Sequence, residues 1–139
     1  MRTLSVFFLI VTACYGCHNE GDILTAQQRE VIKNKCELDL PENLNLLYTD
    51  REDRDGIHYV WSLFSKEKVQ LINRNFPAEK NKAPEELTGV DYIEKVSGKR
   101  ISKPRECYML NWITSSNAEV RITLIRNPQG DYIYIEFFS

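Results

Sequence analysis

Residues 118–138, AEVRITLIRNPQGDYIYIEFF, contain two runs of alternating β-forming residues joined by a turn sequence. Pro128 and Gly130 stand at the second and fourth positions of a four-residue turn, as a type I turn favours. A loop of this length pairs apolar residues with each other and opposite charges with each other: Leu124–Ile133, Ile122–Ile135, Val120–Phe137, Arg126–Asp131 and Arg121–Glu136. A shift by one residue would place Glu136 opposite Ile122, which side-chain pairing disfavours. The sequence therefore predicts a C-terminal β-hairpin in this register.

Further strands are expected at 44–49, with Leu44, Leu46 and Tyr48 on one face, and at 57–64 and 106–114. Thr25 and Gln28 form a capping box for a helix that runs to about Cys36. A second helix is expected at 65–76, where Val69, Ile72 and Phe76 recur at helical spacing. Residues 77–104 are the least regular stretch; 90–96 fits either a helix or a strand, and the whole stretch could serve as a binding loop.

The expected fold class is therefore α+β: an antiparallel sheet of about five strands, one or two packed helices and the C-terminal hairpin. With 139 residues in total, we expect a single domain over 25–139.

The outward face of the hairpin is unusually apolar, because it carries Ile125, Tyr132, Tyr134 and Phe138. One interpretation is that a helix covers this face, for example the one expected at 65–74. The other is that it forms an aromatic platform for a partner or ligand.

The amino terminus has the organisation of a signal peptide. Arg2 precedes an apolar segment, LSVFFLIV at 4–11, which is too short to span a bilayer but has the length of a signal-peptide core. Small residues follow at Thr12 and Ala13. A buried N-terminal strand or helix, or a secretory signal cut near Ala13 or Gly16 without lipid, are the alternatives.

The sequence V-T-A-C at 11–14 resembles the lipobox of bacterial lipoproteins. The resemblance covers residues 1–14 only, and the single Arg in a short charged region departs from it. It implies that 1–13 is a cleaved signal peptide and that Cys14 carries a lipid. Residues 14–24 then form an acylated tether, and the protein is anchored to a membrane of the cell envelope, facing the periplasm or the surface.

Cys14 and Cys17 also match a C-x-x-C pattern, but a redox site of that kind needs a βαβ setting that is lacking here. The position of Cys17 leaves it as a spare thiol in the tether. An exported protein meets an oxidising compartment, so we expect a disulfide between Cys36 and Cys107. Two buried thiols are one alternative, and Cys17 as a competing partner, if Cys14 is the acylated residue, is the other.

Other chemistry has little support in the sequence. DREDRDG at 50–56 resembles a calcium loop, but Arg51 and Ser62 occupy positions that need acids, so a solvated turn is expected. No zinc-ligand spacing, nucleophile elbow or phosphate loop is present, and we expect no catalytic residue, metal or cofactor. The net charge of −2 and the scattered Lys and Arg argue against nucleic-acid binding.

Three functions are compatible with this pattern. The first is a non-enzymatic binding or inhibitor module at the membrane, with an envelope protein as a candidate partner. The second is a structural or accessory envelope lipoprotein, for which a large apolar patch away from the hairpin is expected. The third is a small periplasmic hydrolase around His58, which requires a carboxylate or hydroxyl group within hydrogen-bond reach of that ring.

Overall fold

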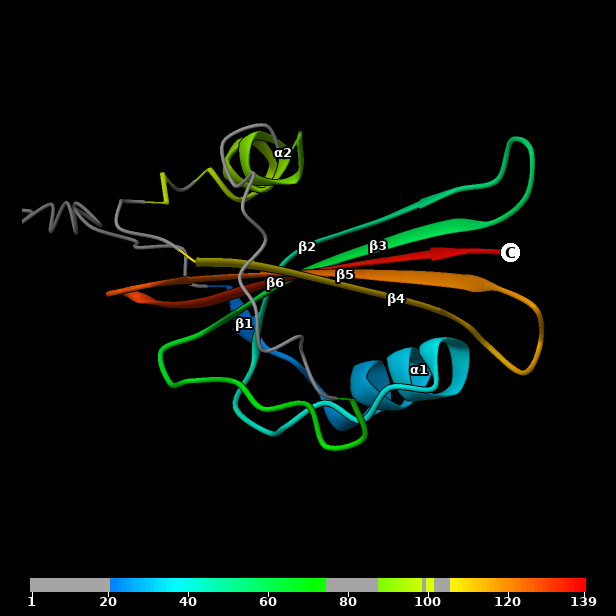
Figure 1. Ribbon diagram of the computed structural model, residues 1–139, viewed down its shortest axis with the longest axis horizontal. Helices are drawn as coiled ribbons and strands as arrows, with labels where there is room; N and C mark the ends of the chain where they lie inside the picture. Colours follow the sequence, from blue (N-terminus) through cyan, green and yellow to red (C-terminus); the bar gives the residue numbers. More distant parts are fainter. Residues whose placement is uncertain (1–20, 75–87, 99, 102–105) are drawn as a thin grey trace, which may run out of the picture.

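The computed structural model describes residues 21–74, 88–98, 100–101 and 106–139 (Figure 1). Six antiparallel strands form one sheet in the order β1-β2-β3-β6-β5-β4. The strands are β1 (Asp22–Ile23), β2 (Asn45–Glu52), β3 (His58–Ser65), β4 (Glu106–Ile113), β5 (Glu119–Asn127) and β6 (Gly130–Phe138), and the helices are α1 (Ala26–Cys36) and α2 (Thr88–Ser97). The protein is thus mostly sheet, with one strand more than expected.

The C-terminal hairpin forms in the predicted register, and all five predicted pairs are confirmed. The connection is tighter than a four-residue loop, because Asn127 and Gly130 also pair. The Asn127 side-chain oxygen accepts hydrogen bonds from the N–H groups of Gln129 and Gly130. Gly130 has φ 150°, and a Cβ there would collide with the carbonyl oxygen of Ser65. Only glycine therefore fits this position.

The two faces of the sheet bury separate cores. The first face packs against α1 and the segments around it, and its cluster includes Ile32, Leu63, Ile122 and Ile135. The second face packs against α2 and includes Ile93. Figure 1 shows α1 and α2 on opposite sides of the sheet. A strand buried on both faces reads as a continuous apolar run, which explains the two apolar faces of the hairpin.

Helix α1 begins as predicted. The Thr25 hydroxyl accepts a hydrogen bond from the N–H of Gln28, and the Gln28 side chain accepts one from the N–H of Thr25, at 3.1 and 2.8 Å. Ile32 and Cys36 face the first core. The helix ends where Glu37 adopts the left-handed conformation, with φ 54°.

The expected face assignment in β2 is wrong for Tyr48. A β-bulge lies between Leu46 and Tyr48, since Leu46 pairs with Leu63 but Tyr48 pairs with Ser62. The extra residue, Leu47, reverses the alternation of side chains. Leu46 consequently packs on the first core and Tyr48 on the second.

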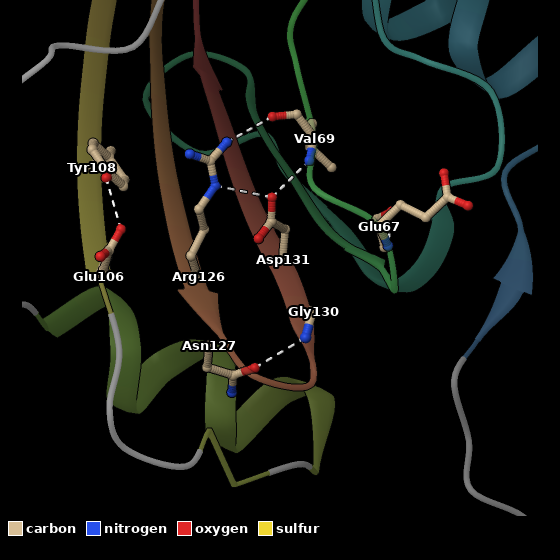
Figure 2. Close-up of polar contacts among 9 residues, drawn as sticks. Glu67, Val69, Glu106, Tyr108, Arg126, Asn127, Gly130 and Asp131 are labelled. Carbon is tan, nitrogen blue, oxygen red and sulfur yellow. Dashed lines mark hydrogen bonds and ion pairs between the residues drawn. The ribbon is translucent and has the colours of Figure 1, made fainter.

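The helix expected at 65–76 is absent from its described residues, 66–74. The backbone N–H of Val69 donates to Asp131 Oδ2 at 2.7 Å, and its carbonyl accepts from Arg126 Nη2 at 2.8 Å (Figure 2). Side chains of β5 and β6 thus replace helical hydrogen bonds. Val69 and Leu71 point inward while Ile72 is 72% exposed, which is alternation rather than helical spacing.

The amino-terminal boundary of the sheet lies earlier than expected. Asp22 and Ile23 pair with Leu46 and Asn45, and Leu24 is buried with 1% exposure. The expected tether, 14–24, includes these residues, so its end is wrong. A two-residue strand gives no periodic signal, so only its pairing with β2 reveals it. The start of the tether, including Cys14, lies outside the described residues, as does most of 77–104.

Candidate binding surface

The aromatic platform expected on the hairpin is wrong for three of its four residues. Ile125, Tyr132 and Tyr134 are buried, at 0%, 2% and 6% exposure. Helix α2 lies over them, and Tyr92 of that helix meets the Tyr134 ring at 5.5 Å. The covering helix is therefore α2, which resolves the ambiguity at 90–96, and not residues 65–74. Only Phe138 remains partly accessible.

Helix α2 covers only one end of the second face. Beneath it, the register aligns a mostly apolar row of Phe64, Tyr132, Ile125 and Cys107. The next row carries hydroxyl groups on four adjacent strands: Tyr48, Ser62, Tyr134 and Thr123. Figure 1 shows the far half of the face extending beyond α2 toward the carboxyl terminus.

We call this far half the open half-face. It consists of two five-residue rows: Asp50, Val60, Glu136, Arg121 and Asn111, and then Glu52, His58, Phe138, Glu119 and Ile113. All of these residues except Val60 are exposed or partly exposed. The same face of one sheet therefore changes from apolar to charged where α2 stops.

Carboxylates dominate the open half-face. It holds four of them against the guanidinium of Arg121 and the imidazole of His58. Arg121 Nε donates to Glu119 Oε1 at 2.7 Å, and this hydrogen bond raises the pKa of Arg121. The guanidinium also lies 5.0 Å from the Phe138 ring centre, which is the range of a cation–π contact. The ring of Phe138 therefore already contacts a cationic side chain, that of Arg121.

His58 lies beside Phe138 and Glu136. Its ring stacks on Phe138 at 4.3 Å, and its Nε2 is 3.5 Å from Glu136 Oε1. Within the described residues this nitrogen has no hydrogen-bond partner. Ser62, on the same face, is four residues along β3, or about 13 Å away at the usual strand rise. The arrangement supplies a carboxylate beside the ring, and Ser139 lines the same pocket, but no hydroxyl group of the described residues hydrogen-bonds to His58.

The hydroxyl row at the margin of α2 is more buried. The Tyr48 hydroxyl donates to Asp50 Oδ2 at 3.2 Å, and desolvation is the main cause that raises the pKa of Tyr48. Burial likewise raises the pKa of Tyr134 far above its ordinary value. Ser62 is 0% exposed, and its Oγ has no hydrogen-bond partner among the residues that the structure describes.

A pocket of about 400 Å³ lies at the far end of the open half-face. Its lining includes Glu52, Asp55, His58 and Phe138, and it lies where the β2–β3 turn rises away from the sheet (Figure 1). The solvated turn expected at 50–56 is shorter than predicted, because β2 extends through Glu52, but residues 51–56 are exposed as expected. The pocket thus joins carboxylates and the Phe138 ring of the sheet surface to Arg54, which also lines it and pairs with Glu52 at 3.2 Å.

The expected disulfide between Cys36 and Cys107 is absent. Neither residue is in a disulfide bond; Cys36 belongs to the core of the first face and Cys107 to that of the second. The sheet separates the two thiols, so they cannot meet. Burial raises the pKa of Cys36 to about 12, which leaves it a protonated, unreactive thiol.

The described residues contain no cluster of three or more His, Cys, Asp or Glu that could hold a metal ion. In the same part of the chain, no helix has the length and apolar character needed to cross a membrane. Exposed large apolar side chains are distributed over several elements: Ile23, Val31, Ile72, Tyr92, Met109 and Ile113. Comparisons with protein-family models, curated proteins and solved structures found no significant match.

Sequence reasoning missed Asp50, Ser62 and Glu136 as members of one surface. Each has an ordinary local context, and the sequence offered only the pairing of Arg121 with Glu136. Their grouping depends on two facts: β3 pairs with β6, and the bulge in β2 places Asp50 on the second face. An alternation pattern read across that bulge would place Asp50 on the wrong side.

Proposed function

We propose that this protein is a lipid-anchored protein of the bacterial cell envelope, that its domain is a non-enzymatic binding module, and that the open half-face is its contact surface. The lipid anchor rests on the signal-like segment and on Cys14 within V-T-A-C. The observation that carries the binding assignment is that α2 covers one end of the second face and leaves a charged, partly aromatic surface with a pocket at its end.

A binding role accounts for this surface better than catalysis does. His58 stacks on Phe138 and lies beside Glu136, and no hydroxyl group of the described residues hydrogen-bonds to its ring. Rigid strands, rather than loops, present most of the side chains. Such a surface is preorganised for contact, which lowers the entropic cost of binding.

Site-specific photo-crosslinking in living cells tests the contact surface. A benzophenone side chain replaces Ile113, which is 61% exposed on the open half-face, and separately Ile72, which is 72% exposed and lies on another surface. We expect a discrete crosslinked product from position 113 and none from position 72. Products from position 72 alone would contradict the proposed surface.

Mass spectrometry of the protein purified from membranes tests the anchor. We expect a chain that begins at Cys14 and carries a lipid mass on that residue. The variant Cys14→Ser should lose the lipid and leave the membrane fraction. An unmodified chain that retains Met1 in the membrane fraction would contradict the anchor.

A further inference from the structure

The two edges of the sheet differ in how they are protected. At one edge, β1 pairs with the start of β2, a bulge follows between Leu46 and Tyr48, and 50–52 are charged. Bulges and charged side chains are the usual features that keep an edge strand from pairing with another chain. At the other edge, β4 pairs with β5 without a bulge, and the sequence from Cys107 to Ala118 contains no charged residue and no proline. The β4 edge therefore lacks the features that discourage a further strand.

The backbone of β4 directs polar groups away from the sheet at three residues. The N–H of Thr114 donates to the carbonyl of Ala118, so these two residues form a hydrogen-bonded pair at the end of the β4–β5 ladder. Bonded and non-bonded pairs alternate along an antiparallel ladder. Met109, Asn111 and Ile113 consequently point their N–H and C=O groups away from β5. Within the described part of the chain, these outward groups have no hydrogen-bond partner.

The side chains at the same three positions are accessible. Met109 is 41% exposed, Ile113 is 61% exposed, and Asn111 between them is exposed as well. Leu110 and Trp112, on the other face of the strand, are half-buried. An edge with these properties suits strand addition, in which backbone hydrogen bonds give affinity and alternate side chains give specificity.

The strand that best matches this edge is the same edge of a second copy. In an antiparallel pair of two β4 strands, a two-fold axis perpendicular to the sheet keeps each face continuous across the junction. With the axis at Asn111, Met109 of one copy faces Ile113 of the other. Leu110 faces Trp112 in the same way, so both pairs are apolar. The two Asn111 amides meet on the axis, where each has both donors and an acceptor.

Other registers match less well. An axis at Trp112 would place Asn111 opposite Ile113, which pairs a polar with an apolar side chain. An axis at Leu110 would also oppose Asn111 to an apolar residue, and it would extend the pairing into 106–108, whose residues already take part in other interactions. An axis between two residues would oppose side chains from different faces of the sheet. The sequence of the edge therefore selects Asn111 as its centre.

We propose that β4 pairs with β4 of a second copy about an axis at Asn111, so that two domains form one continuous sheet. The outward residues of the two copies would form about six backbone hydrogen bonds, two for each of three pairs. An edge of this length is smaller than the interface of a typical stable complex, so the dimer is weak and needs a high local concentration.

The dimer has a consequence for the open half-face, although it does not depend on the proposed binding function. Because the axis is perpendicular to the sheet, the open half-faces of the two copies lie on the same side and adjoin at the β4 edge. Asn111 and Ile113 belong to both the open half-face and this edge. Dimerisation would therefore join two open half-faces into one larger surface.

Cysteine crosslinking of the full chain tests the proposal. The background carries Cys14→Ser and Cys17→Ser, and the remaining thiols, Cys36 and Cys107, are buried. Residues that face each other in a hydrogen-bonded pair have Cα atoms about 5.5 Å apart, a separation that a disulfide bridges. With about 100 µM protein and diamide as the oxidant, Asn111→Cys should form a disulfide-linked dimer.

The flanking positions test the register. Met109→Cys and Ile113→Cys should not crosslink alone, because each thiol is about 13 Å along the strand from its equivalent in the second copy. An equal mixture of the two chains should form a mixed dimer, which mass spectrometry identifies. The control is Ile72→Cys, at a site that is 72% exposed on another surface, and it should give only background crosslinking.

A charge on the axis provides a second variant. Asn111→Lys, introduced into both chains of the Met109→Cys and Ile113→Cys mixture, places two like charges opposite each other and should lower the yield of mixed dimer about tenfold or more. Ile72→Lys in the same mixture should leave the yield unchanged. Circular dichroism and thermal melts establish that every variant is folded.

A folded Asn111→Cys chain that crosslinks no more than Ile72→Cys would overturn the dimer. Met109→Cys that crosslinks with itself as efficiently as with Ile113→Cys would overturn the register. The in-cell photo-crosslink from position 113 to a different protein tests the proposed binding function separately, because that product does not have twice the mass of the chain.

Discussion

At the scale of single residues, the pair Arg126–Asp131 connects the hairpin to the segment that contains Val69. Arg126 Nε and Asp131 Oδ2 are 3.1 Å apart, with side-chain exposures of 21% and 5%. Together they hold both backbone polar groups of Val69 (Figure 2). The predicted cross-strand pair therefore does more than fix the hairpin register, because it also determines the path of residues 66–74.

Replacing Asp131 with Asn should destabilise the protein by about 2–4 kcal/mol, since it leaves the largely buried guanidinium of Arg126 without its counter-charge. Urea unfolding of Asp131→Asn measures this loss. The control is Glu119→Gln, which breaks the exposed pair with Arg121 and should cost less than about 1 kcal/mol. Similar losses for the two variants would contradict the structural role of Asp131.

The cysteines give a prediction about pH. Burial raises the pKa of Cys36 from 9.0 to about 12 in the folded protein. The unfolded chain therefore loses this proton first, and the stability contributed by Cys36 is complete below about pH 9 and is lost as the pH rises toward 12. Unfolding free energies measured from pH 8 to 11 should fall less steeply in Cys36→Ala.

The same thiols report on the missing disulfide. In a chain with Cys14→Ser and Cys17→Ser, a thiol reagent should modify Cys36 and Cys107 slowly when the protein is folded and completely in denaturant without reductant. The sheet places the two residues in different cores, so no bond should protect them. Two thiols that stay unreactive in denaturant until reductant is added would show that the disulfide exists.

At the scale of elements, the start of α1 is set by neighbouring residues in the sequence, whereas the position of α2 is set by contacts with distant strands. The capping box of Thr25 and Gln28 is visible in the sequence and is formed in the structure. Helix α2 has no comparable signal, and its position follows from the apolar row that it covers on β3, β4, β5 and β6. This difference explains why the start of α1 could be predicted to the residue, whereas 90–96 remained ambiguous.

Thr25→Ala should destabilise the protein by about 1 kcal/mol, because the N–H of Gln28 loses its acceptor at the start of α1. Thr25→Ser is the control and should retain most of the stability, since it keeps the hydroxyl. Denaturant unfolding of both variants measures the difference. If Thr25→Ser were as unstable as Thr25→Ala, the hydroxyl would not be the stabilising group.

At the scale of the whole molecule, the folded domain extends farther toward the amino terminus than composition suggests. Leu24 is 1% exposed and donates its N–H to the Leu44 carbonyl at 2.7 Å, beside the pairing of β1 with β2. If Cys14 carries a lipid, about eight residues separate it from β1, which corresponds to less than about 30 Å of extended chain. The sheet would then lie close to the membrane surface.

A chain that begins at Thr25 should therefore be less stable than one that begins at Gly21, by about 2–3 kcal/mol for the lost burial of Leu24. Thermal or urea unfolding of the two truncated chains measures the difference. Leu24→Ala in the longer chain separates the effect of the side chain from that of the β1–β2 hydrogen bonds. Equal stability of the two truncated chains would place the domain boundary at Thr25 after all.

The sequence alone determined the hairpin register, the expected strands from 57 onward and the start of α1, because side-chain alternation, turn residues and helix caps act between residues close in the chain. It did not determine the path of 66–74, the face of Tyr48 or the separation of Cys36 from Cys107. Each of these depends on an interaction between distant segments: the Arg126–Asp131 pair, the bulge opposite β3 and the sheet that divides two cores. The open half-face also depends on distant segments, because it begins where α2 stops covering the second face, beside Tyr134.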